Sequence, residues 1–142
     1  MYREAAADAT QVLTLQPEVT DPNVLLLRAR AYAGDKKLNP ALDDLNKAIE
    51  VKPDLVDAYI ERGMVFVQAL RFDDAIGDLT RAIEIDPQSA KAYAMRASVK
   101  LQAAPSAAAN AEANTQANDD ALNDVNQALQ IFGNVAQLAA DL

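Results

Sequence analysis

Residues 22–53 read PNVLLLRARAYAGDKKLNPALDDLNKAIEVKP, and residues 56–87 read VDAYIERGMVFVQALRFDDAIGDLTRAIEIDP. The two stretches align without a gap at a spacing of 34 residues and share eight identical positions. The identical pairs are Arg28/Arg62, Ala41/Ala75, Asp44/Asp78, Leu45/Leu79, Ala48/Ala82, Ile49/Ile83, Glu50/Glu84 and Pro53/Pro87. Identity at a fixed period of this length predicts that a small structural unit is repeated along the chain.

Each unit predicts a pair of helices. In the second unit, Tyr59, Gly63 and Phe66 fall on one helical stripe. After a short break, apolar residues recur at spacings of three and four from Phe72 onward, which is the period of a second amphipathic helix. Pro87 ends the pattern because proline cannot continue a helix interior. Small side chains such as Gly63 and Ala75 allow the two helices to pack closely where they cross.

The 34-residue period, the Tyr59-x3-Gly63-x2-Phe66 stripe and the closing Pro87 resemble the tetratricopeptide repeat, as does the Ala75/Ala82 pair. The resemblance departs from the family pattern at Leu25 and Tyr59, where the family often has tryptophan. It implies an all-α fold, a right-handed superhelix of stacked helix-turn-helix repeats, which is an α-solenoid.

We expect residues 1–142 to form a single domain cut from a larger protein, divided at the repeat boundaries. The predicted parts are the second helix of a truncated repeat (1–17), full repeats at 22–53 and 56–87, a repeat at 90–133 and a capping or next-repeat helix at 134–142. The third repeat carries an Ala- and Asn-rich insertion of 12 residues within 103–118. Alanine favours a longer helix there, whereas Pro105 and low complexity favour a loop, and we expect one helix to stop near Pro105 and the next to begin upstream of Asp119.

An arginine and an aspartate recur at fixed places in each hairpin. The arginine lies on the first helix and the aspartate on the second, which predicts the ion pairs Arg28–Asp44, Arg62–Asp78 and Arg96–Asp124. A partly buried, bidentate pair would fix how the two helices of a hairpin align. We therefore interpret these six residues as structural rather than as a charged ligand site.

Composition excludes several classes of function. The net charge of −8 disfavours nucleic acid as a partner, because acidic surfaces repel phosphate. The absence of cysteine and histidine removes thiol nucleophiles, zinc-thiolate sites and the commonest general base. No apolar run is long enough to insert into a membrane, and no phosphate loop or catalytic set is present. We expect no enzyme activity, no cofactor and no metal, and a cytoplasmic or cytosol-facing location.

The resemblance implies a concave groove built mainly from the first helix of each repeat. Residues off the packed stripe of those helices are predicted to line it: Asn23, Leu26, Leu27, Arg30, Asp57, Ile60, Glu61, Met64, Lys91, Ala94, Met95 and Ser98. One family subgroup grips chaperone C-termini with a Lys/Asn/Arg cluster, of which only Lys91 matches here. Another uses an asparagine ladder, where this chain has Leu27, Glu61 and Met95. Both modes are therefore disfavoured.

The predicted function is a protein-binding module, within a larger protein, that holds a peptide or helix of its partner in this groove. A chaperone adaptor or protein-transport role falls in this class. Two alternatives stay open: a segment of an organelle import receptor that recognises precursor proteins, and a substrate-recruiting accessory to an enzyme. Self-association is a further possibility, since the truncated first repeat is expected to expose Ala5, Ala9, Val12 and Leu13.

Overall fold

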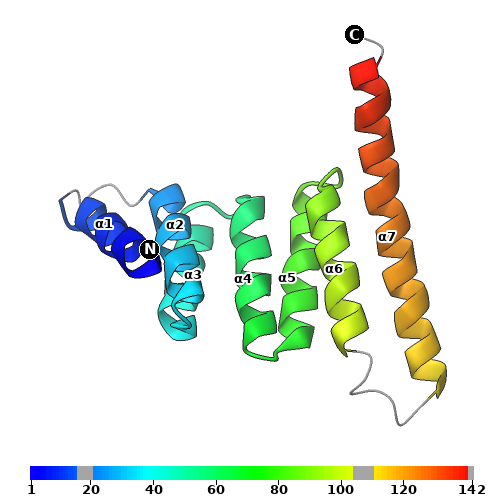
Figure 1. Cartoon of the computed structure of the whole chain (residues 1–142), viewed down its shortest axis with the longest axis horizontal. Helices are drawn as coiled ribbons and strands as arrows, with labels where there is room; N and C mark the ends of the chain where they lie inside the picture. The colour runs from blue at the N-terminus through cyan, green and yellow to red at the C-terminus, as the bar shows by residue number, and fades with distance from the viewer. Residues whose placement is uncertain (16–20, 104–110, 141–142) are drawn as a thin grey trace. The chain divides into compact units, whose positions relative to one another are not determined.

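The computed structural model describes residues 1–15, 21–103 and 111–140, and every regular element in these ranges is a helix (Figure 1). The helices are α1 (Tyr2–Leu15), α2 (Pro22–Gly34), α3 (Leu38–Val51), α4 (Val56–Gln68), α5 (Phe72–Ile85), α6 (Ala90–Ala103) and α7 (Ala111–Ala140). They fall into two compact units, Met1–Leu70 and Arg71–Leu142, which are described separately below.

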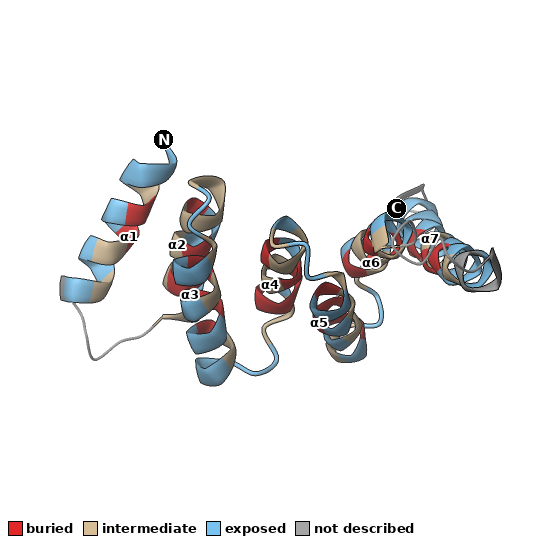
Figure 2. Ribbon diagram, turned by 90° about the horizontal axis from the view of Figure 1, so that it is seen from below, coloured by how far each residue is buried: buried red, intermediate tan, exposed pale blue. Residues whose placement is uncertain are grey.

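The first unit contains α1 to α4, each packed against its neighbour along the chain, and α2 also contacts α4. Its core is a cluster of buried residues from three of these helices: Leu25, Leu26, Ala29, Ala41, Leu45, Ala48, Ala58 and Val65. The alanines of this cluster are at most 1% exposed and Ala41 is completely buried, as close packing of a hairpin requires. Figure 2 shows the buried positions of these helices gathered on the sides where they meet.

The prediction that the apolar side chains of the first helix are exposed is partly wrong. Ala9 is buried and Leu13 packs against the core of the first unit, because α1 lies directly on α2. Val12 is exposed and Ala5 is half-buried. Self-association through this face therefore stays a prediction that rests on fewer apolar side chains than the sequence indicated.

The second unit contains α5, α6 and α7, with α6 packed against both of the others. Ala75, Leu79 and Ala82 of α5 are fully buried. At the junction of α6 with α7, Ala90, Ala128 and Ile131 form a small apolar cluster on which Tyr93 packs. Alanine thus recurs at the close contacts of both units.

The last helix differs from the prediction. Gly133 stands where Pro53 and Pro87 stand in the earlier repeats, and the sequence predicted a separate element at 134–142. Instead α7 continues through Gly133 to Ala140 as one helix of 30 residues. Glycine weakens a helix but keeps its backbone N–H and has no ring to clash with the preceding turn, so it does not end the helix as proline does.

The region of the predicted insertion is described only at its edges. α6 ends at Ala103, two residues before Pro105, and α7 begins at Ala111, upstream of Asp119, both as expected. Residues 104–110, which carry the centre of the insertion, lie outside the described residues.

Candidate functional site

Arg28 and Asp44 form a bidentate ion pair between α2 and α3. The Arg28 Nε donates to Asp44 Oδ2 at 2.7 Å, and Nη2 donates to Oδ1 at 2.6 Å. The hydrogen bonds to Asp44 raise the pKa of Arg28, against the opposing effect of burial. The Tyr32 ring lies 5.8 Å from the guanidinium carbon, within reach of a cation–π interaction.

Asp124 lies at the centre of a larger network between α6 and α7. It is 1% exposed, and it accepts hydrogen bonds from Arg96 Nε at 2.9 Å and Nη2 at 2.6 Å. Lys100 Nζ adds a third at 2.8 Å. Burial opposes ionisation of Asp124, but the hydrogen bonds from Arg96 and Lys100 outweigh it and hold the pKa of Asp124 below its usual value. Asp124 is therefore a buried carboxylate with two cationic partners.

The arginines also bond to the helix that precedes them, which the sequence analysis missed. Arg28 Nη1 reaches Thr10 Oγ1 at 3.4 Å, and Arg62 Nη1 donates to Asn46 Oδ1 at 2.7 Å. Arg96 Nη1 donates to Thr80 Oγ1 at 3.0 Å. Each acceptor lies two residues after the position that carries aspartate in its helix. Thr10, Asn46 and Thr80 recur at this position of the repeat, and this recurrence of a polar side chain could have indicated the bond from the sequence.

The predicted pair Arg62–Asp78 joins residues of different units, since Arg62 belongs to α4 and Asp78 to α5. Asp78 is buried and Arg62 lies over the Tyr59 ring, with 5.6 Å between the guanidinium carbon and the ring centre. The pair itself stays a prediction.

The predicted groove residues divide by exposure. Eight are exposed, namely Asn23, Leu27, Arg30, Asp57, Met64, Lys91, Ala94 and Ser98. Glu61 and Met95 are half-buried. Leu26 and Ile60 are buried, at 6% and 1% exposure, so the prediction that they line an open surface is wrong. A first helix within a stack is packed on more than one side: α2 touches α1, α3 and α4, and Leu26 belongs to the core.

In the first unit, the exposed positions of α2 and α4 are joined by an ion pair. Arg30 Nη2 lies 2.9 Å from Glu61 Oε1. Leu27 lies one turn before Arg30 on α2, and Met64 lies one turn after Glu61 on α4, and both apolar side chains are exposed. The result is a surface with two accessible apolar groups beside a charge pair that neutralises itself.

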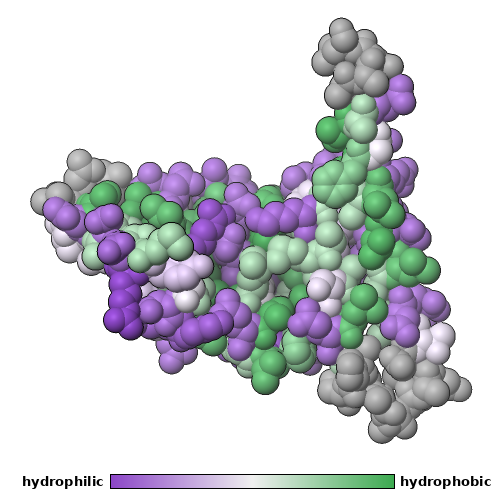
Figure 3. All heavy atoms as spheres, in the orientation of Figure 1, coloured by the Kyte–Doolittle hydropathy of each residue, from purple (hydrophilic) through white to green (hydrophobic). Residues whose placement is uncertain are grey.

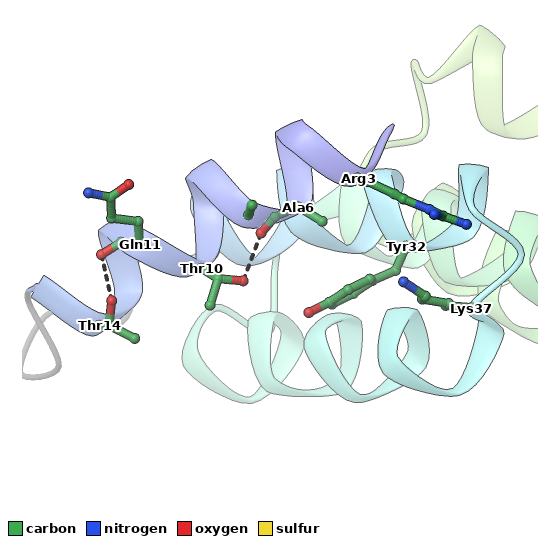
Figure 4. Close-up of a pocket in the computed structure, with 8 residues that line it drawn as sticks. Arg3, Ala6, Thr10, Gln11, Thr14, Tyr32 and Lys37 are labelled. Atoms are coloured by element: carbon green, nitrogen blue, oxygen red, sulfur yellow. Dashed lines mark hydrogen bonds between the residues drawn. The ribbon is translucent and has the colours of Figure 1, made fainter. Parts of the chain in front are cut away.

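A cleft of about 480 Å³ lies beside α1 in the same unit (Figure 4). Its lining residues are Arg3, Ala6, Ala7, Thr10, Gln11, Thr14, Tyr32 and Lys37. Arg3 and Lys37 lie toward one end, but both also contact Asp35, at 3.2 and 2.8 Å, and that carboxylate offsets one of their two positive charges. The hydrogen bonds from Lys37 and then Arg3 lower the pKa of Asp35, so this carboxylate stays ionised. The cleft was not predicted, because nothing in the sequence showed how α1 lies against Tyr32.

Two further findings concern the described residues alone. None of the helices in these ranges is both long and apolar enough to cross a membrane. No three acidic side chains among the same residues come close enough together to hold a metal ion.

Residues 27–100, just over half of the chain, match the tetratricopeptide repeat family. The chain belongs to this family. The match covers the whole predicted hairpin at 56–87 and, from Leu27 onward, the hairpin at 22–53 with its Arg28–Asp44 pair. Membership of the tetratricopeptide repeat (TPR) family accounts for the 34-residue period. The predicted all-α fold of stacked helical hairpins is confirmed.

Comparison with solved structures supports the same fold. A crystal structure of MamA matches with a TM-score of 0.78 and 20% identity, over 96% of this chain and 71% of that one. MamA 41-end from Desulfovibrio magneticus RS-1 matches with a TM-score of 0.75 and 15% identity, over 94% and 67%. The second TPR of Spaghetti (RPAP3), bound to the HSP90 peptide SRMEEVD, matches with a TM-score of 0.64 and 17% identity, over 83% and 98%.

One curated relative is more similar in sequence. The DnaJ protein P58IPK homolog of Arabidopsis thaliana is 40% identical over 73 residues, which is 46% of this chain but only 15% of that protein. The chain thus spans only a small part of its relative's length.

Proposed function

We propose that this TPR chain is a protein-interaction module that holds an amphipathic helix or apolar peptide of a partner against the exposed face of its first helices. The observation that carries the proposal is the surface of the first unit. There Leu27 and Met64 are exposed on neighbouring helices beside the Arg30–Glu61 ion pair. Large apolar side chains displayed on a rigid helical face are typical of a helix-in-groove or peptide-binding surface.

The charges on this surface indicate what kind of partner it fits. Because Arg30 and Glu61 neutralise each other, the surface offers no net charge to attract an acidic tail. Apolar contact at Leu27 and Met64 then supplies most of the binding free energy, and methionine adapts to partners of irregular shape. The ion pair gives orientation, since a partner with its own charges can exchange hydrogen bonds with either residue.

The second unit has a related surface on α6. Lys91, Ala94 and Ser98 are exposed there, and Met95 is half-buried. We infer that α6 gives the second unit a binding surface of its own, with one apolar and one cationic group. Contacts of this size fit a dissociation constant of roughly micromolar order, which suits exchangeable recognition.

The test uses charge placed on the apolar face. The double variant Leu27→Asp/Met64→Asp should abolish binding of a purified partner or of a library-selected amphipathic peptide, because both new carboxylates would have to be desolvated on binding. Val51→Asp is the matched control: Val51 is an exposed apolar residue of the same unit but lies on α3, a second helix. Binding is measured by isothermal calorimetry, and helicity by circular dichroism.

The outcome that refutes the proposal is equal binding by the double variant and the wild type. Ile60→Asp is unsuitable for this test, because Ile60 is buried and a buried carboxylate would unfold the protein rather than probe its surface.

A role as a chaperone adaptor is a second candidate, favoured by the likeness to a DnaJ protein homolog and to a TPR bound to an HSP90 peptide. The groove positions argue against the usual charged clamp, since Glu61 and Met95 replace the required polar and basic residues. Titration with the peptide SRMEEVD decides the matter: we expect no saturable binding, and tight binding lost on Lys91→Ala would favour the clamp instead.

The import-receptor and enzyme-accessory roles would use the same surface for a different purpose. A precursor presequence is an amphipathic helix of the kind that Leu27 and Met64 fit, whereas an enzyme substrate would be presented to a neighbouring catalytic domain. Binding assays with a set of presequence peptides separate the two, since only the import role predicts a preference for them.

A further inference from the structure

The outer face of α7 carries a continuous apolar stripe. It consists of Leu122, Val125, Leu129, Phe132 and Ala136, which recur at spacings of three and four residues, and it is called the α7 stripe below. Leu122, Leu129 and Phe132 are 58%, 62% and 59% exposed, respectively. Figure 3 shows apolar side chains gathered along the length of α7. The spacing is that of a helix seam which packs against another helix.

The stripe lies next to the side that α7 already buries. Ala121, Asp124, Ala128 and Ile131 precede the stripe positions by one residue each and are buried. One residue corresponds to a rotation of about 100° around a helix. The stripe is therefore a second apolar face that α6 does not cover.

The first unit shows what covers the same face in an interior repeat. Ala41 aligns with Ala121, so Leu45 and Ile49 of α3 align with Val125 and Leu129. Leu45 is fully buried in a cluster that includes Ala58 and Val65 of α4, and Ile49 packs against that cluster. A following helix covers this face in α3, whereas Val125 is only half-buried and Leu129 is open. The missing occupant of the stripe is accordingly a helix.

The length of α7 indicates which helix fits. α3 ends at Val51, just before the chain turns back at Pro53, so a following repeat helix covers a face of that length. The α7 stripe continues past the equivalent point, with Phe132 beside Gly133 and Ala136 beyond it. A second copy of α7 is long enough to cover the whole stripe.

The charges along α7 favour the same partner. Between Ala121 and Gln137 the only charged residue is Asp124, which is buried and paired with Arg96 and Lys100. Asparagine and glutamine fill most of the exposed positions beside the stripe, and none of these positions is charged. In a chain of net charge −8, this is a surface on which two identical copies meet without like-charge repulsion.

We propose that two copies of this chain associate through their α7 stripes as an antiparallel helix pair. Pairing centred on Gln127 sets Leu122 of one copy against Phe132 of the other, and Val125 against Leu129. It also places the acidic residues Asp119 and Asp120 of the two copies at opposite ends of the seam, where a parallel pair would bring them together.

Sedimentation velocity over micromolar to near-millimolar concentrations tests the proposal. The wild-type chain should pass from monomer to dimer, and Leu129→Gln/Phe132→Gln should weaken dimerisation by about 100-fold or more, since each large apolar group contributes roughly tenfold or more on burial. Leu101→Gln is the matched control, because Leu101 is a similarly exposed leucine on α6 of the same unit. Circular dichroism should show equal helicity in all three proteins.

Disulfide formation tests the orientation, because the chain has no cysteine of its own. In the antiparallel pair, Asn118 of one copy lies opposite Ala136 of the other, while the two Asn118 residues are about 27 Å apart. A mixture of Asn118→Cys and Ala136→Cys chains should therefore form a mixed disulfide, and Asn118→Cys alone should not. A purely monomeric wild type, an unchanged double variant or a rapid Asn118→Cys homodimer would each overturn the proposal.

Discussion

Replacing Asp124 by asparagine should destabilise the second unit more than any other conservative change of one polar side chain. The substitution keeps the size of the side chain but removes the charge that Arg96 and Lys100 share. Both cations are mostly buried, with side-chain exposures of 16% and 18%, so water cannot replace the lost carboxylate. Loss of one partner from a buried ion pair typically costs about 3–5 kcal/mol.

The structure supplies an internal comparison for this estimate. Asp44 accepts from Arg28 alone and has no lysine partner among its described contacts, so Asp44→Asn leaves a single uncompensated cation. We expect Asp124→Asn to lie toward the upper end of the range and Asp44→Asn toward the lower end, about 3 kcal/mol. Urea unfolding at neutral pH, followed by circular dichroism, measures both, and the exposed Asp120→Asn is the control, with an expected change within about 0.5 kcal/mol.

The same residue predicts a dependence on pH. Because the pKa of Asp124 is lowered in the folded protein, its stabilisation is complete above the unfolded value of about 3.9 and is lost as the pH falls through the lower folded value. Between pH 5 and strongly acidic conditions the wild type should therefore lose more stability than Asp124→Asn. The reasoning fails if Asp124→Asn costs less than about 1 kcal/mol, or if the two proteins lose stability in parallel on acidification.

Four further changes test local features of the helices. Gly77→Ala should raise the free energy of unfolding by about 0.5–1 kcal/mol, because an added methyl group meets nothing within 4 Å and alanine favours the helix; a loss of stability in thermal unfolding would contradict this. Gly34→Ala should have the opposite sign, since the new Cβ would lie 2.5 Å from the Tyr2 ring, and faster amide exchange in α1 should accompany the loss. Leu70→Gly should stabilise by about 1 kcal/mol in urea unfolding, because Leu70 is held at a φ of 60° that only glycine adopts without strain. Ala41→Leu should destabilise by about 1–3 kcal/mol, because Ala41 is fully buried at a helix crossing; unchanged thermal unfolding would show that the crossing has room.

The repeat made the fold predictable from the sequence. The small residues that the alignment at spacing 34 held constant have the same environment in both hairpins, as Ala41 and Ala75 show by their complete burial. The same logic applied to Arg28 and Asp44, whose pairing follows from their fixed places on two adjacent helices. The 34-residue period and the residues that are identical between repeats thus specify which side chains meet inside a hairpin.

Exposure on the first helices was harder to predict, because it depends on the number of neighbouring helices rather than on the period. Leu26 and Leu27 are adjacent leucines, yet one belongs to the core and the other is exposed. Ile60 and Met64 differ in the same way, although they lie one turn apart on α4. A sequence of apolar residues on several sides of a helix does not show which side remains open.

The backward bonds of the arginines connect the core to the proposed binding surface. Arg28 holds α2 to α3 through Asp44 and to α1 through Thr10, and α2 is the helix that presents Leu27 and Arg30. The position of these surface residues is therefore fixed by a polar network that lies apart from the proposed contact residues. A preformed surface loses little conformational entropy on binding. The network therefore favours binding because it holds the surface residues in position before the partner arrives. Replacing Arg28 should then reduce binding although Leu27 and Arg30 themselves are unchanged. Such a result would separate a positioning role of Arg28 from direct recognition of the partner.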